Sequence, residues 1–135
     1  MTYYLSRNGS TFVVPQYSIR DDRGGELTCP DLVTLDFPAV TVEVVEVKTA
    51  PRQRLGDLIS NVNARESRWF GPLRRQLQRL RFPIDDEWTF GCRVFVSEDA
   101  VEYVKSSVTD PIRVTIEALE DVAFPWRWSW PTTGE

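Results

Sequence analysis

The stretch VTVEVVEVKTA, residues 40–50, predicts an extended β-strand and is the basis for interpreting the rest of the chain. Successive side chains in a strand alternate between two faces, so Glu46 and Lys48 share one face while Val45 and Val47 share the other. A carboxylate and an ammonium therefore lie two residues apart near the C-terminal end of a strand that is otherwise rich in valine.

The length and composition of the chain indicate one globular domain. Its 135 residues are 41% hydrophobic and include seven Phe, five Trp and four Tyr, which argues against long disordered stretches. No apolar run approaches the roughly 20 residues that cross a bilayer, and the first residues lack a signal pattern. We therefore expect a cytoplasmic protein without a membrane partner, in which Cys29 and Cys92 are free thiols.

The sequence contains no histidine. This excludes Ser-His and Cys-His catalysis, histidine acid–base chemistry and histidine metal ligands. Any catalysis must rest on carboxylates, Lys, Arg, Tyr or a bound metal.

The first third of the chain predicts strands. Asn8–Gly9 is a preferred two-residue turn and predicts an N-terminal β-hairpin within residues 1–20. Residues 21–26 predict a turn, and residues 27–36 predict a strand that pairs antiparallel with the strand ending at Lys48.

The remaining chain predicts helices alternating with strands. Apolar residues recur at helical spacing from Leu55, and Gly71–Pro72 is expected to divide this segment into two helices. Residues 87–97 predict a central strand, residues 98–108 a short helix, and a last strand is expected from Ile112. The fold class expected is α/β (α+β): a single domain with a central mixed β-sheet flanked by helices.

Aromatic residues alternate at the end of the last predicted strand. The alternating positions are Val122, Phe124, Trp126, Trp128 and Trp130. Such a stripe is more often core or a homodimer contact than a surface for stacking bases. A homodimer through this strand is therefore one expected partner arrangement.

The net charge of −4 conceals a basic segment in the middle of the chain. Residues 52–81 carry a charge of +6, whereas the segments before and after carry −3 and −7. The guanidinium fork matches phosphate oxygens, so the cluster predicts nucleic-acid contacts, for which we select Arg52, Arg54, Arg65 and Arg68. The alternative is an ordinary solvated helix face.

The order of motifs resembles the PD-(D/E)XK nuclease superfamily, also called restriction-endonuclease-like. Pro30–Asp31 stands for the "PD" and Glu46-Val47-Lys48 for the "(D/E)XK", followed by an arginine-bearing helix, a strand, a helix and a strand. The resemblance covers residues 26–105 and implies one restriction-endonuclease-like domain over residues 1–135.

The chemistry of three residues agrees with that resemblance. Asp31 and Glu46, on neighbouring strands, could hold Mg²⁺ or Mn²⁺ through oxygens. Such an ion activates water near neutral pH, and Lys48 would stabilise the charge that develops on the phosphate. The alternatives are a surface ion pair for Glu46 and Lys48 and turn chemistry for Asp31.

The resemblance implies two further metal ligands. One is the backbone carbonyl of Val47. The other is an acid that family members carry on a helix before the first core strand, which this chain lacks. Glu26, or otherwise Asp21 or Asp22, would have to replace it.

These observations predict a metal-dependent nuclease that hydrolyses phosphodiester bonds, with DNA expected before RNA. The alternative is a catalytically inactive nuclease-like module that binds nucleic acid or protein. A phage or mobile-element accessory protein, whose acidic C-terminal third binds a basic partner, is a third hypothesis.

Overall fold

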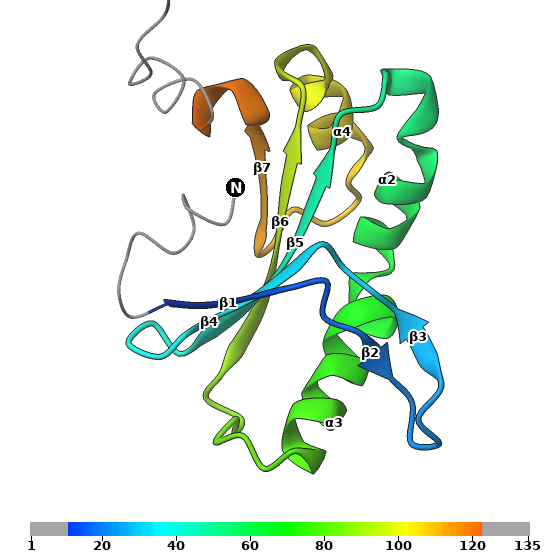
Figure 1. Cartoon of the computed structure of the whole chain (residues 1–135). Helices are drawn as coiled ribbons and strands as arrows, with labels where there is room; N and C mark the ends of the chain where they lie inside the picture. The colour runs from blue at the N-terminus through cyan, green and yellow to red at the C-terminus, as the bar shows by residue number, and fades with distance from the viewer. Residues whose placement is uncertain (1–10, 123–135) are drawn as a thin grey trace, which may run out of the picture.

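Five strands form a mixed β-sheet with helices packed on one face in the computed structural model, which describes residues 11–122 (Figure 1). In spatial order the strands are β1 (Thr11–Pro15), β4 (Leu32–Asp36), β5 (Thr41–Lys48), β6 (Thr89–Val96) and β7 (Val114–Ala118). Strand β5 therefore lies in the centre of the sheet, and the predicted mixed sheet is confirmed.

Strand direction changes at β5. Strand β4 is antiparallel to both β1 and β5, whereas β5, β6 and β7 are mutually parallel. Parallel neighbours need a long crossover, and the chain supplies helices between β5 and β6 and between β6 and β7. The predicted antiparallel pairing of the two motif-bearing strands is confirmed.

The helical segment after β5 has three parts. After the short helix η1 (Arg52–Arg54) come α2 (Gly56–Asn63), the π-helical turn η2 (Glu66–Phe70) and α3 (Gly71–Arg79). Pro72 has no N–H to donate to the preceding turn, and the Gly71 N–H bonds instead to the Glu66 carbonyl, five residues back. The segment forms two helices as predicted, but α2 ends at Asn63 and the break lies at Ala64, whereas the backbone stays helical from the π-turn through Gly71. The predicted position of the break, Gly71–Pro72, is therefore wrong.

The second crossover consists of η3 (Glu98–Ala100) and α4 (Val101–Ser107), as predicted. Helices α2, α3 and α4 pack on the face of β5 that carries Val42 and Val44, both fully buried. On the other face, Val45 packs with Leu32 and Phe95 in a second cluster that includes Leu119 and Val122. None of the described helices is long and apolar enough to span a membrane.

The predicted strand over residues 27–36 is divided in the structure. Its first residues belong to β3 (Glu26–Thr28), which pairs with β2 (Ile19–Arg20) in a separate two-stranded sheet around the predicted turn. Strand β4 begins only after Cys29, Pro30 and Asp31, because proline cannot continue a ladder of hydrogen bonds.

Two further predictions, the N-terminal hairpin and the C-terminal aromatic stripe, fall largely outside the described residues. The Asn8–Gly9 turn of the predicted hairpin lies outside the described residues. Within the described residues, β1 pairs with β4. Val122 is helical rather than extended, and the rest of the aromatic stripe, with the homodimer contact assigned to it, lies outside the described residues.

Candidate functional site

The break between β3 and β4 places Asp31 beside the end of β5. Leu32 pairs with Val45 in the ladder, so Asp31 occupies the next position, opposite Glu46. The Gln16 N–H donates to the Asp31 carbonyl at 2.7 Å, and the Val47 N–H donates to Asp31 Oδ2 at 2.8 Å. The Asp31 carboxylate thus replaces the strand partner that β4 no longer supplies.

Glu46 completes a reciprocal arrangement with Asp31. Its Oε1 accepts a hydrogen bond from the Asp31 N–H at 3.3 Å. Each carboxylate therefore accepts a backbone N–H from the strand of the other. The two acids selected from the sequence lie side by side.

The environment of Glu46 disfavours its charged form. Burial, followed by the negative charge of Asp31, raises the pKa of Glu46 to about 7, although the Asp31 N–H and the Lys48 charge act in the opposite direction. Lys48 is exposed at the end of β5. A cation placed against the pair would remove the repulsion between the two carboxylates.

Glu26 lies in β3 and is exposed. Its Oε1 accepts a hydrogen bond from Ser18 Oγ at 2.6 Å. Desolvation and then the charges of Glu26, Asp31 and Glu46 raise the pKa of the Cys29 thiol, although Cys29 is largely exposed. The electrostatic influence of Glu26 therefore reaches the residues next to the pair.

A third side-chain ligand does not join the pair. Within residues 11–122, no three or more Cys, Asp or Glu side chains lie close enough together to hold a metal ion. Mg²⁺ is nevertheless commonly held by one or two carboxylates, with water and substrate phosphate at its other positions. The donor set of Asp31 and Glu46 fits that mode of binding, whereas the structure gives no support to Glu26 as a ligand.

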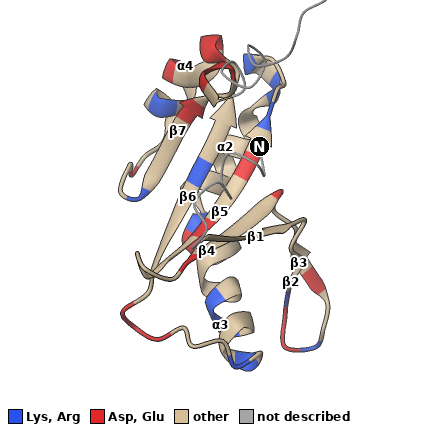
Figure 2. Cartoon of the chain, turned by 60° about the vertical axis from the view of Figure 1, so that its left-hand side comes forward, with Lys and Arg blue, Asp and Glu red and all other residues tan. Residues whose placement is uncertain are grey.

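Three of the four selected arginines are exposed. Arg52 and Arg54 lie in η1, directly after β5, and Arg68 lies in η2. The Arg52 guanidinium lies over the Tyr103 ring, 5.2 Å from its centroid, which fixes η1 against α4. Figure 2 shows further basic residues spaced along α3.

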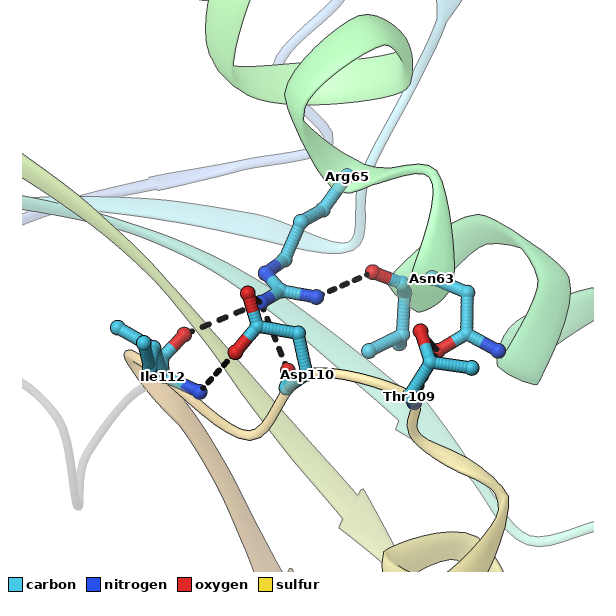
Figure 3. Close-up of polar contacts among 6 residues, drawn as sticks. Asn63, Arg65, Thr109, Asp110 and Ile112 are labelled. Atoms are coloured by element: carbon cyan, nitrogen blue, oxygen red, sulfur yellow. Dashed lines mark hydrogen bonds and ion pairs between the residues drawn. The ribbon is translucent and has the colours of Figure 1, made fainter.

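Arg65 differs from these three because it is buried (9% exposed). It donates hydrogen bonds to the carbonyls of Val62, Asp110 and Ile112 at 3.0, 2.8 and 3.1 Å, and its guanidinium lies 3.7 Å from the Asp110 carboxylate (Figure 3). These contacts engage its Nη1 and Nη2 groups and bury the side chain, so the structure gives Arg65 a structural role and does not support the predicted phosphate contact. Its spacing from Leu58 and Val62, seven and three residues, was the available signal that it faces the core.

The sequence interpretation missed an ion-pair cluster on the other face of the sheet. Arg93 on β6 lies between Glu43 on β5 and Glu117 on β7, at 3.3 and 2.8 Å. All three side chains are about one quarter exposed. The cluster joins three adjacent strands.

No protein-family model matches the sequence, and no curated protein or solved structure matches it either. The chemistry of the Asp31–Glu46 pair is therefore the basis for a functional proposal.

Proposed function

We propose that the chain is a metal-dependent nuclease of restriction-endonuclease-like fold that hydrolyses phosphodiester bonds, in DNA before RNA. The observation that supports this most directly is that two hydrogen bonds, from the Asp31 N–H to Glu46 Oε1 and from the Val47 N–H to Asp31 Oδ2, hold the two carboxylates side by side. The exposed Lys48, two residues after Glu46 on the same strand, supports the same function.

Asp31 and Glu46 would hold Mg²⁺ or Mn²⁺, with the Val47 carbonyl as a further oxygen donor. A divalent ion bound there withdraws charge from a phosphate and acidifies water. The chain itself contributes the fixed positions of the two carboxylates, because Asp31 accepts the Val47 N–H of β5 and Glu46 accepts the Asp31 N–H just before β4.

Lys48 would contribute a cation at the reacting phosphate. An ammonium fixed at the end of a strand stabilises the negative charge that develops as the phosphodiester is attacked. Arg52 and Arg54 follow within six residues and Arg68 lies on the next helical segment, so they are the candidates for neighbouring phosphates.

The second candidate is a catalytically inactive module that binds nucleic acid or protein. The observation in its favour is that no third Cys, Asp or Glu ligand joins the pair within the described part of the chain. A module that binds nucleic acid would use the same arginines, but only the nuclease requires a divalent ion.

Cleavage assays separate the two candidates. Plasmid DNA and short single- and double-stranded DNA and RNA are incubated with the wild type in Mg²⁺, Mn²⁺ or EDTA, and metal binding is measured by calorimetry. We expect cleavage that requires the metal, and loss of both metal binding and cleavage in Glu46→Gln. Retained nucleic-acid binding with no metal-dependent cleavage of any substrate would support the inactive module.

A further inference from the structure

A polar cavity lies at the amino ends of β6 and β7, away from the acid pair. It has a volume of about 310 Å³ and is lined by residues of α3, of β6 and of the loop before β7, among them Arg74, Trp88, Phe90 and Arg113. Phe90 pairs with Val42 and Val94 pairs with Glu46 in the parallel ladder. The cavity is therefore about 13 Å along the strands from Glu46.

One wall of the cavity suits a planar ring. The Arg74 guanidinium lies over the Phe90 ring, 4.6 Å from its centroid, and an ion pair of 3.4 Å with Glu66 holds it there. A guanidinium that covers one ring can stack a second planar group on its other face. Trp88, half-buried beside it, adds a further aromatic surface.

The cavity lining also includes a cation that has no ion-pair partner among the described residues. Arg113 is exposed and makes no ion pair within residues 11–122. Its backbone has a φ of 57°, a conformation that residues with side chains rarely adopt, and its carbonyl accepts a hydrogen bond from the Cys92 N–H at 2.9 Å. Strained backbone of this kind persists where surrounding contacts enforce it.

Those surrounding contacts come from the end of α2 and the residues just after it (Figure 3). Arg65 donates to the carbonyls of Asp110 and Ile112, and Asn63 Oδ1 accepts a hydrogen bond from the Thr109 N–H at 3.0 Å. The loop that carries Arg113 is therefore fixed before any ligand arrives. A preformed rim reduces the entropy lost on binding.

We infer that this cavity binds a nucleoside monophosphate, free or as one unit of a strand. The base stacks on the outer face of the Arg74 guanidinium, beside Trp88, and the phosphate pairs with Arg113. The carboxylates of Glu66 and Asp110, which also line the cavity, can accept hydrogen bonds from exocyclic amino groups of a base. The volume is at the small end of ligand pockets and suits a single nucleotide.

This site needs no metal, so it can be tested separately from the proposed nuclease. Calorimetry in EDTA would compare dAMP with adenosine and with inorganic phosphate on the full chain. We expect dAMP to bind more tightly than either fragment. No preference for dAMP over inorganic phosphate would overturn the inference.

The chain offers a matched pair of variants. Arg113→Gly removes the cation and relieves the positive φ, and Arg81→Gly does the same at an exposed arginine with a φ of 62° after α3. We expect Arg113→Gly to weaken dAMP binding roughly tenfold, the effect of one charge-assisted hydrogen bond, and Arg81→Gly to leave it unchanged. Equal binding by the two variants would contradict the assignment.

A further experiment with an oligonucleotide distinguishes a free nucleotide from one unit of a DNA strand as the ligand. Binding of a short single-stranded DNA in EDTA that falls in Arg113→Gly but not in Arg81→Gly places a unit of a strand in the cavity. Dependence on Arg113 for dAMP alone assigns the cavity to free nucleotides. Dependence for neither ligand overturns the inference.

Discussion

Two glutamates of β5 lie three residues apart and on opposite faces of the sheet, in contrasting surroundings. Glu43 bonds to Arg93, whose guanidinium also pairs with Glu117. Glu46 instead accepts a hydrogen bond from the backbone N–H of Asp31, and the Asp31 carboxylate lies beside it. Within residues 11–122, no ion pair joins Glu46 to a basic side chain.

The difference separates a glutamate that is held in ion pairs from a glutamate that has no basic partner within residues 11–122. An arginine between two carboxylates compensates both, so the Arg93 cluster holds three strands together. The Asp31–Glu46 pair lacks that compensation, and burial raises the pKa of Glu46 to about 7. A fold that keeps two uncompensated carboxylates together loses stability, which is typical of groups arranged for chemistry or ion binding.

The largest expected effect concerns the residue that follows the uncompensated pair. Lys48→Ala should slow metal-dependent cleavage by about 100-fold or more, roughly 3 kcal/mol of transition-state stabilisation, because one fixed cation is lost. Folding and metal binding should be nearly unchanged, since Lys48 is exposed. Single-turnover rates on plasmid DNA measure the effect.

Lys105→Ala is the matched control, because Lys48 and Lys105 are the two lysines of the sequence and Lys105 is exposed on α4. Its cleavage rate should equal that of the wild type. Equal cleavage by the wild type and Lys48→Ala would indicate a contaminating nuclease.

Removing the arginine of the compensated cluster should have the next largest effect. Arg93→Met leaves Glu43 and Glu117 partly buried and without a partner, and we expect a loss of about 2 kcal/mol in the free energy of unfolding. Urea unfolding followed by tryptophan fluorescence measures it.

Arg79→Met provides the comparison for an exposed pair. Arg79 bonds to Asp22 at 2.7 Å, but the Asp22 side chain is 82% exposed. The loss there should stay below about 1 kcal/mol. Equal losses in the two variants would remove the structural distinction of the Arg93 cluster.

The same contrast predicts that replacing each glutamate of β5 by the uncharged glutamine changes the free energy of unfolding in opposite directions. In metal-free protein, Glu46→Gln should raise the free energy of unfolding at pH 8 by on the order of 2 kcal/mol, allowing for partial exposure. Glu43→Gln should lower it by about 1 kcal/mol, because Arg93 loses a charged partner. Denaturant titrations in EDTA measure both.

The pH dependence follows from the direction of the shift. The pKa of Glu46 rises from 4.5 to about 7 on folding, so the folded protein binds this proton more tightly than the unfolded chain. The contribution of the group to stability is complete below pH 4.5 and is lost as the pH rises through about 7. The advantage of Glu46→Gln should therefore grow between pH 5 and pH 8, and parallel profiles would contradict a raised pKa.

Local patterns were sufficient to predict the strand over Glu46 and Lys48, its antiparallel partner and the helical crossovers. The side-chain pattern of residues 40–48 can be read within a single strand. Pro30 marks a strand end because proline has no N–H to donate to a neighbouring strand. The adjacency of Asp31 and Glu46 followed from these two features.

The Arg93 cluster could not be predicted in the same way. Its members are separated by 50 and 24 residues and meet only because β5, β6 and β7 are neighbours in a particular register. The burial of Arg65 depends likewise on the loop before β7, more than 40 residues away. Composition alone groups all eight arginines of residues 52–81 as one basic cluster. In the folded protein Arg65 is buried, whereas Arg52, Arg54 and Arg68 are exposed.

The smallest expected effect is on DNA binding, and it tests whether the exposed Arg54 contacts a phosphate. Arg54→Ala, directly after β5, should weaken DNA binding roughly fivefold at 0.15 M salt and reduce the log–log salt slope by about 0.9, the effect of one lost phosphate contact. Arg23→Ala, an equal change of charge in the exposed turn between β2 and β3, should alter neither quantity. Fluorescence anisotropy of a labelled duplex across a salt series, in EDTA, measures both. An unchanged slope in Arg54→Ala would assign this arginine to the solvated surface and would leave Lys48 as the nearest candidate cation for a bound phosphate.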